Sequence, residues 1–278
     1  MDQPKLYSKN KQMQTVDNVF VIEKYAKLIQ WKANDAMVLD IGCGDGYTTY
    51  NILRPELPKN FKKLVGWDLS EKMIRFAKES YQEQEPRIEF GLMDISKDGQ
   101  EDDFCAQYDH VVSFYCLHWV PEQRQAFKNI YKTLKPGGDM LISLVVTAPI
   151  FSVYENMAKN IRWSSYFRKE TVSPYHNSQN PAAELQSILE EIGFQNCSCT
   201  VENRHYTFSS WQILQSGIIA VNPTIPTLTD TDKAAYISDF MEEVRKIYGF
   251  SKEMTDSGVS VPVDYKLLIA YARRPENS

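Results

Sequence analysis

Residues Met37-Val-Leu-Asp-Ile-Gly-Cys-Gly-Asp-Gly46 decide the fold that we expect for this chain of 278 residues. The apolar run 37–41 predicts a short buried strand, and residues 47–53 after the glycines predict a helix. Glycines between a strand and a helix let the backbone turn sharply and approach a ligand closely. They are Gly42, Gly44 and Gly46. A strand, a glycine turn and a helix in this order open a doubly wound α/β unit.

The same alternation of strand and helix continues on both sides of this stretch. An amphipathic helix is predicted at 18–31, because apolar residues recur there at helical spacing. Further strands are predicted at 64–68, 88–92, 109–115, 140–146, 196–202 and 265–271. This pattern favours an α/β fold with a doubly wound, mostly parallel, seven-stranded sheet of Rossmann-like type. Ligands are then expected at the carboxyl ends of the strands.

The chain is expected to form a single domain, 1–278, whose two halves differ in composition. Residues 1–148 carry the strand–helix alternation and are expected to bind mainly the cofactor. The segments 149–175 and 209–248 predict helices rich in aromatic and aliphatic residues. We interpret these helices as a helical cap over the substrate site.

Composition narrows the classes of partner. Lys and Arg number 31 against 36 Asp and Glu, so the formal charge is -5, and no basic run stands out. Phosphate binding needs clustered cations, so neither a nucleic acid nor an anionic membrane is expected as a partner. No apolar run approaches the roughly 20 residues that a membrane span requires. The five Cys are an odd number, which favours reduced thiols and a cytoplasmic location.

The glycine spacing indicates the kind of cofactor. A dinucleotide fingerprint places its third glycine three residues after the second, where this chain has Tyr47. The observed spacing suits a ligand without a pyrophosphate, and S-adenosylmethionine is such a ligand. Its ammonium favours a carboxylate near the loop, which Asp40 supplies, and its ribose diol favours an acid at the end of the next strand, which Asp68 supplies. Asp94, which ends the third strand, is placed to accept a hydrogen bond from the adenine amine.

Neighbouring residues complete the predicted cofactor site. Ile95 is expected to pack on the adenine ring, with Leu69 and Tyr115 beside the ligand. The alternative interpretation is that the acids only form turns at strand ends, as Asp often does. Three acids at three successive strand ends after a glycine loop make that coincidence improbable. A class I methyltransferase that uses S-adenosylmethionine, releases S-adenosylhomocysteine and needs no metal is therefore predicted.

Other motifs resemble a particular family. The chain reads Ser113-Phe-Tyr-Cys-Leu-His-Trp119 after the fourth predicted strand, and its amino-terminal segment reads Leu6-Tyr7 followed by Gln14. Further matching stretches are Pro149-Ile-Phe151, Ser173-Pro-Tyr-His176 and Tyr271-Ala-Arg-Arg274. Together these features resemble the insect juvenile hormone acid O-methyltransferases over nearly the whole chain.

The resemblance implies methyl esterification of sesquiterpenoid acids such as farnesoic acid or juvenile hormone acid. By motif position, Gln14 and Trp119 then hold the substrate carboxylate. Such a carboxylate is already ionised at neutral pH, so neutral donors that position it are sufficient. A small lipophilic carboxylic acid is the implied partner. The residues expected to contact it are Tyr7, His118, Ile150, Phe151, Tyr154 and Tyr175.

Two other functions stay open on the sequence alone. The chain could methylate a different hydroxyl or amine acceptor with His118 as general base, although a packed, hydrogen-bonded imidazole is the commoner role of such a residue. It could also bind the cofactor without catalysis. Trp119 alone could be a core residue, and Gln14 alone could be a surface residue. The apolar helices after residue 149 could instead cover a homodimer interface.

Overall fold

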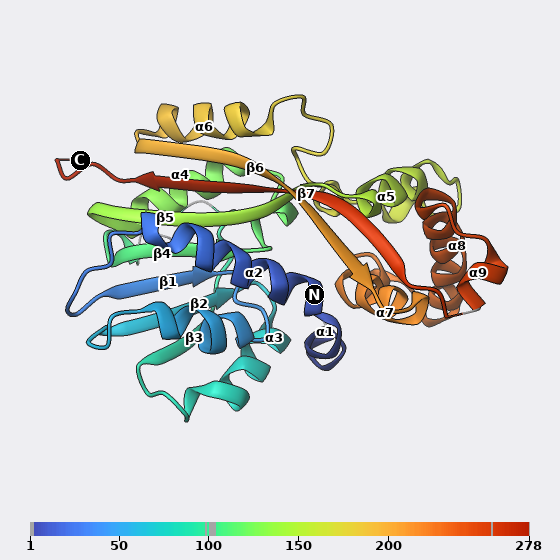
Figure 1. Cartoon of the computed structure of the whole chain (residues 1–278), viewed down its shortest axis with the longest axis horizontal. Coiled ribbons are helices and arrows are strands. Elements are labelled where there is room, and N and C mark those ends of the chain that lie inside the picture. The colour runs from blue at the N-terminus through green and yellow to red at the C-terminus, as the bar shows by residue number, and fades with distance from the viewer. Residues whose placement is uncertain (1–2, 98, 100–103, 257, 278) are drawn as a thin grey trace.

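The computed structural model of the chain describes residues 3–97, 99, 104–256 and 258–277. The strands of these residues form one seven-stranded sheet in the order β3-β2-β1-β4-β5-β7-β6 (Figure 1). They are β1 Met37–Ile41, β2 Lys63–Asp68, β3 Ile88–Leu92, β4 Tyr108–Phe114, β5 Leu134–Thr147, β6 Gln195–Phe208 and β7 Val261–Arg273. β7 runs antiparallel to both of its neighbours, and the other neighbouring pairs are parallel. The predicted fold class is therefore confirmed.

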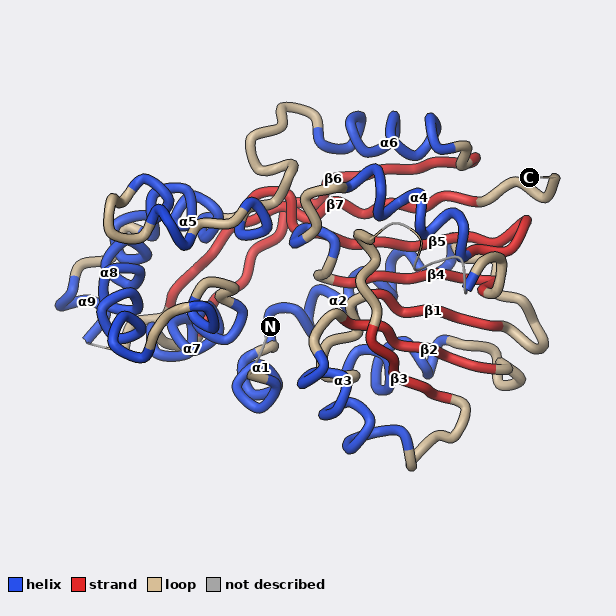
Figure 2. The backbone as a smooth tube through the Cα atoms, turned by 180° about the vertical axis from the view of Figure 1, so that it is seen from behind, coloured by secondary structure: helices blue, strands red, loops and turns tan. Residues whose placement is uncertain are grey.

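Helices cover both faces of the sheet. The α-helices among the described residues are α1 Pro4–Asn10, α2 Gln12–Tyr25, α3 Glu71–Ala77, α4 Gln123–Thr133, α5 Pro149–Lys159, α6 Pro181–Ile192, α7 Trp211–Val221, α8 Asp230–Tyr248 and α9 Lys252–Asp256. Figure 1 shows α2 and α3 in front of the sheet, and Figure 2 shows α4 and α6 on the opposite face. Successive strand residues alternate between the two cores: Val38 packs with α2 and α3, whereas Leu39 packs with α4 and α6. This alternation is what a doubly wound sheet requires.

A group of helices lies beyond the carboxyl ends of the parallel strands (Figures 1 and 2). We call α5, α7, α8 and α9 the cap. β6 and β7 are 14 and 13 residues long, whereas β1, β2 and β3 have five or six. The longer strands therefore continue past the rest of the sheet and reach the cap as a paired arm (Figure 1).

Several element boundaries differ from the prediction. The helix expected at 18–31 begins at Gln12 and ends at Tyr25. Its start was not predicted because the buried face there includes the polar residues Asp17 and Asn18, which an apolar pattern does not reveal. Within the predicted helical segment 149–175, the first helix begins at Pro149 and already ends at Lys159. The strand expected at 196–202 extends to Phe208, since it lies at the edge of the sheet and alternate side chains face solvent.

Candidate active site

The loop 42–46 leaves β1 at the edge where the parallel strands end. Gly42, Gly44 and Gly46 have φ of +76°, +55° and +78°, a region that favours glycine. A Cβ on Gly42 would overlap the side chain of Cys116, and one on Gly46 would come within 2.9 Å of the Cβ of Ala77. At Gly44 the nearest atom is Cε1 of Tyr7, at 3.8 Å. Packing thus requires two of the glycines, whereas the third leaves the backbone accessible to a ligand.

Asp68 ties this loop to the end of β2. Its Oδ2 accepts a hydrogen bond from the backbone N–H of Gly44 at 3.0 Å, and its Oδ1 accepts one from the N–H of Ser70 at 2.8 Å. Burial raises the pKa of Asp68 above its usual range, and these two hydrogen bonds oppose the rise. The adjacent Leu69 is 67% exposed. The carboxylate therefore has a fixed orientation beside the glycine loop.

Asp94 follows β3, the strand next to β2 in the sheet. Its Oδ1 accepts hydrogen bonds from the backbone N–H of Ser96 at 3.0 Å and from the Ser96 hydroxyl at 2.6 Å. Ile95 is buried beside it. The structure thus places the three predicted acids at the ends of three neighbouring strands, on one edge of the sheet.

Asp40 lies in β1 beneath the loop and is almost fully buried. Its carboxyl accepts a hydrogen bond from the hydroxyl of Thr49 at 2.7 Å. Burial raises the pKa of Asp40 to about 7; the Thr49 hydrogen bond lowers it, and the nearby charge of Asp68 raises it. Asp40 is therefore a carboxyl group whose charge a bound cation can change near neutral pH.

A largely apolar cavity lies between the amino-terminal helices, the turn after β4 and the cap. Tyr7 of its wall also approaches Gly44 of the loop. Five of the predicted acceptor contacts and both predicted carboxylate-binding residues line it: Tyr7, Gln14, His118, Trp119, Ile150, Phe151 and Tyr154. Neither Lys nor Arg is among the described residues of its wall.

Gln14 and Trp119 both line this cavity although 105 positions separate them in the chain. Gln14 lies in the first turns of α2, and its Oε1 is buried without a hydrogen-bond partner among the described residues. Trp119 ends a short 3₁₀ turn after β4, with its ring centroid 6.4 Å from that of Phe151. An uncharged amide side chain and an indole ring, each with N–H groups that can donate, therefore line the same space.

His118 is unsuited to act as a base. Burial lowers the pKa of its imidazole to about 3, so the ring is neutral at physiological pH and accepts a proton poorly. Its Nδ1 accepts a hydrogen bond from the backbone N–H of Val145 at 3.4 Å. That bond places the ring proton on Nε2. His118 is therefore a hydrogen-bond donor in the cavity wall.

A buried carboxylate that the sequence did not single out supports this wall. Asp17 of α2 is fully buried and accepts hydrogen bonds from the hydroxyls of Tyr115 and Tyr265, the latter at 2.7 Å. It also forms an ion pair with Arg204 of β6 at 2.8 Å. Both tyrosines line the cavity, and Asp17 is one helical turn after Gln14. Asp17 thus fixes α2 and its glutamine against the sheet.

Tyr115 and Tyr175 lie on different faces of the sheet. Tyr115, which stays a predicted neighbour of the cofactor, lines the apolar cavity, and its backbone has φ +55°. Tyr175 was expected to contact the acceptor, yet it packs in the core on the other face of the sheet. Its hydroxyl donates to Oε1 of Gln123 at 3.3 Å. The cavity wall includes apolar residues from β6, β7 and α7 that the sequence did not distinguish from core: Phe208, Leu214, Ile218 and Val263.

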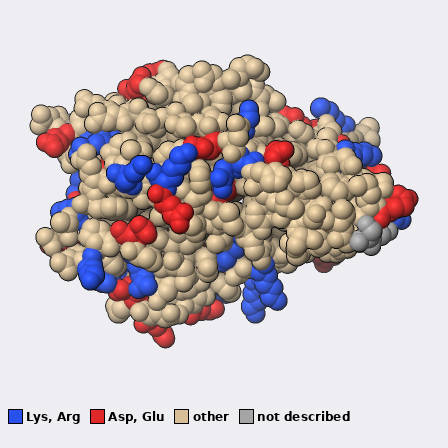
Figure 3. Space-filling model, in the orientation of Figure 1, with Lys and Arg blue, Asp and Glu red and all other residues tan. Residues whose placement is uncertain are grey.

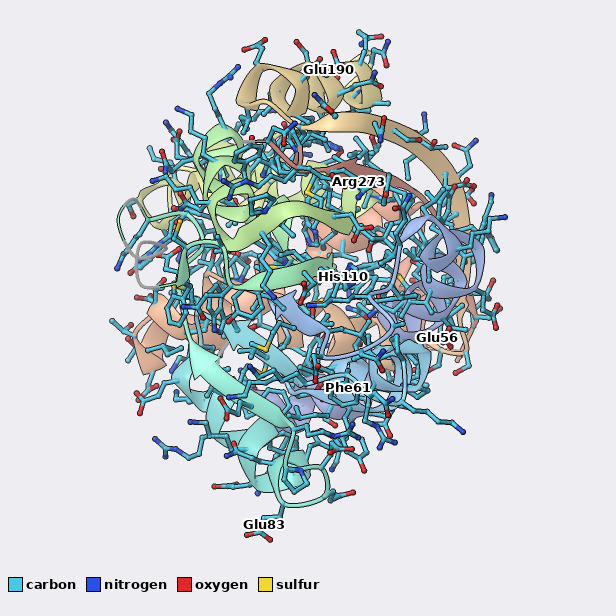
Figure 4. The ribbon with its side chains drawn as sticks, turned by 90° about the vertical axis from the view of Figure 1, so that its left-hand side faces the viewer. Glu56, Phe61, Glu83, His110, Glu190 and Arg273 are labelled. Carbon is cyan, nitrogen blue, oxygen red and sulfur yellow. The ribbon has the colours of Figure 1, made fainter. Side chains whose placement is uncertain are left out.

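Another buried histidine lies at the opposite end of the sheet. Figure 4, viewed from that end, labels His110 near the centre of the molecule. His110 Nδ1 lies 2.6 Å from Oδ1 of Asp139, and Nε2 accepts a hydrogen bond from the backbone N–H of Lys32 at 3.0 Å. This pair is far from the loop 42–46 and connects the chain before β1 to β5.

Charge is mixed on the outer surface. Figure 3 shows basic and acidic side chains interspersed on the viewed face. None of the helices among the described residues has both the length and the apolar character that crossing a bilayer requires. Within the same residues, no cluster of three or more His, Cys, Asp or Glu side chains is arranged to hold a metal ion.

Comparisons with known proteins find methyltransferases. Residues 38–138 match the family model described as a methyltransferase domain. The chain is 33% identical to the juvenile hormone acid O-methyltransferase of Bombyx mori, with 99% of this chain and 98% of that protein aligned. It is 30% identical to the Drosophila melanogaster protein of the same name, with 99% and 93% aligned.

A solved structure shows the same fold. Phosphoethanolamine N-methyltransferase 2 of Haemonchus contortus, in complex with S-adenosyl-L-methionine, superposes with a TM-score of 0.56 at 16% identity. The match covers 98% of this chain and 56% of that chain. At this identity the likeness concerns the fold alone.

Proposed function

Because the chain belongs to the juvenile hormone acid O-methyltransferase family, we propose that this methyltransferase esterifies the carboxylate of a sesquiterpenoid acid, juvenile hormone acid or farnesoic acid. The observation that carries this proposal is that Gln14 and Trp119 line the same apolar cavity, whose wall also includes Tyr7 beside Gly44 of the glycine loop. Neutral donors orient a carboxylate without neutralising it, so the oxygen stays nucleophilic. The apolar wall accommodates an isoprenoid tail.

The loop fits S-adenosylmethionine as methyl donor. Gly44 leaves its backbone open, Asp68 lies beside it with a fixed orientation, and Asp94 and Ile95 lie at the next strand end. When bound, this cofactor supplies an electrophilic methyl group. The protein's own residues then hold the acid: Gln14 and the Trp119 indole N–H donate to its carboxylate, and the Nε2–H of His118 is a third neutral donor in the same wall.

The alternative reaction, on a hydroxyl or amine with His118 as base, has weaker support. A base whose conjugate acid has a pKa of about 3 removes a proton from an alcohol or an ammonium only at a large energetic cost. The carboxylate needs no such base, because it is ionised before it binds.

Replacement of Gln14 by alanine tests the proposed function. We expect kcat/KM for farnesoic acid to fall about 10- to 100-fold, since a hydrogen bond to a charged group contributes about 1.5–3 kcal/mol. The affinity for S-adenosylmethionine should change less than about twofold, because Gln14 lies in the acceptor cavity. Initial rates with labelled methyl donor and calorimetric titration measure the two quantities.

The matched control is Gln12→Ala on the same helix, where the side chain is exposed and bonds only the Lys9 carbonyl among the contacts described. Its turnover should equal that of the unmodified enzyme. Unchanged turnover of farnesoic acid by the Gln14→Ala variant, in an enzyme that methylates some other acceptor, would refute the carboxylate assignment.

Binding of S-adenosylmethionine is also expected to depend on pH through Asp40. With a pKa of about 7, Asp40 is mostly protonated at pH 6 in the free protein, whereas the ligand's ammonium favours the carboxylate. Binding must therefore release a proton below pH 7. Affinity should rise up to about tenfold per pH unit towards 7 and level off above it. Calorimetry in buffers with different ionisation enthalpies counts the released proton.

The Asp40→Asn variant has no carboxyl to ionise, so its affinity should be lower and nearly flat over the same range. An equal slope in both proteins assigns the pH dependence to another group.

A further inference from the structure

The cavity has a second polar feature at its cap end. α5 forms one wall of the cavity. The ring centroid of its Phe151 lies 6.4 Å from that of Trp119. Tyr154 follows one helical turn later, and its ring lies 5.5 Å from that of Phe240 in α8. The wall therefore leads from the predicted carboxylate donors to a tyrosine at the cap.

The hydroxyl of Tyr154 has no hydrogen-bond partner among the described residues, although the side chain is only 2% exposed. Two other tyrosines of the cavity wall differ in this respect, because the hydroxyls of Tyr115 and Tyr265 both donate to Asp17. Burial raises the pKa of Tyr154 well above its usual value, so the group stays protonated and can donate.

A buried hydroxyl without a partner destabilises a protein by about 1–3 kcal/mol. Phenylalanine would fill the same space without that cost. Tyr154 lies among apolar wall residues such as Ile150 and Phe151. Its hydroxyl oxygen therefore makes no polar contact that would stabilise the fold. A ligand atom is the partner that would satisfy it.

We propose that the Tyr154 hydroxyl donates a hydrogen bond to an oxygen on the far end of the substrate's tail, an epoxide, ether or hydroxyl oxygen. Tyr154 thereby determines specificity for oxygenated acids over pure hydrocarbon acids of the same length. This inference rests on the proposed function, because it takes the carboxylate to lie at Gln14 and Trp119.

Two acids that differ only at the tail test it. Farnesoic acid and the same acid with an epoxide in place of its terminal double bond are compared with the unmodified enzyme and the Tyr154→Phe variant. We expect kcat/KM for the epoxide acid to fall about 3- to 10-fold in the variant, the value of one hydrogen bond. The selectivity, kcat/KM for the epoxide acid divided by kcat/KM for farnesoic acid, should fall by a similar factor, because farnesoic acid has no tail oxygen to accept the hydrogen bond.

Tyr236→Phe is the matched control. Tyr236 is a buried phenol stacked on Phe240, but it lies outside the wall of this cavity and its hydroxyl accepts from Asn222 at 3.5 Å. Its loss should affect both acids equally. Urea unfolding adds an independent measurement: Tyr154→Phe should be as stable as the unmodified protein or more stable, because no internal hydrogen bond is lost.

The outcomes separate the two levels of inference. If the unmodified enzyme esterifies both acids and Tyr154→Phe lowers both equally, or destabilises the fold, the role of Tyr154 is overturned while the proposed function stands. If the unmodified enzyme binds S-adenosylmethionine but esterifies neither acid, the proposed function and the inference both fail.

Discussion

The Gly42→Ala variant is expected to lose at least about 100-fold in affinity for S-adenosylmethionine. Alanine at φ +76° costs about 1–2 kcal/mol in the backbone alone. Its Cβ would also overlap the Cβ of Cys116, an atom next to the backbone that cannot swing aside. The loop must therefore move. Its movement displaces the backbone N–H of Gly44, which donates a hydrogen bond to Asp68. A displacement that costs about 2.8 kcal/mol of binding corresponds to 100-fold.

Calorimetric titration with S-adenosylhomocysteine measures this loss, and circular dichroism checks that the variant is folded. Gly249→Ala is the matched control: it has φ +74°, but no atom lies within 4 Å of the added Cβ. That variant has the backbone cost without the collision, and it lies after α8. It should bind the ligand normally. Affinity within about threefold of normal in Gly42→Ala would contradict the expected collision.

The Asp17→Ala variant is expected to lose about 3–5 kcal/mol of unfolding free energy. Removing one partner of a buried ion pair leaves an uncompensated charge, here on Arg204, whose side chain is only 18% exposed. The hydroxyls of Tyr115 and Tyr265 lose their acceptor at the same time. Such a loss is a large fraction of the stability of a typical domain. Urea denaturation measures it.

The matched control is Glu71→Ala, which breaks the exposed pair between Glu71 and Arg75. Pairs of this kind contribute about 0.5 kcal/mol or less on a helix surface, so that variant should unfold almost normally. Asp17→Asn should lie between the two, because an amide oxygen still accepts a hydrogen bond. If Asp17→Ala loses less than about 1 kcal/mol, Asp17 does not hold the wall together.

The fold was largely predictable because its signals are local. Each central strand is a short apolar run, and the glycines after β1 mark the turn to the next helix. The beginning of α2 was missed, since Asp17 and Asn18 look like surface residues until their partners on distant elements are known. The length of β6 was missed because an edge strand needs no continuous apolar run.

The two halves of the site differed in how well the sequence revealed them. Asp40, Asp68 and Asp94 end successive parallel strands, and topology alone brings such positions to one edge. The apolar cavity, where we propose that the acceptor binds, is built from α1, α2, α5, α7, α8 and the long strands, which are distant in sequence. Apolar residues there, such as Phe208 and Val263, have the same pattern as core residues. Tyr175 shows the converse, since a motif residue turned out to pack on the other face.

The paired arm of β6 and β7 has a consequence for how new substrates arise. The cap rests on strands whose hydrogen-bonded ladder is continuous with β5, so the cap is no separate body on a linker. Under the proposed function, substitutions on the cavity-lining faces of α5, α7 and α8 would alter the space for the tail of the acid while the backbone of the arm keeps its register. A change of substrate would then need no change in the position of the glycine loop.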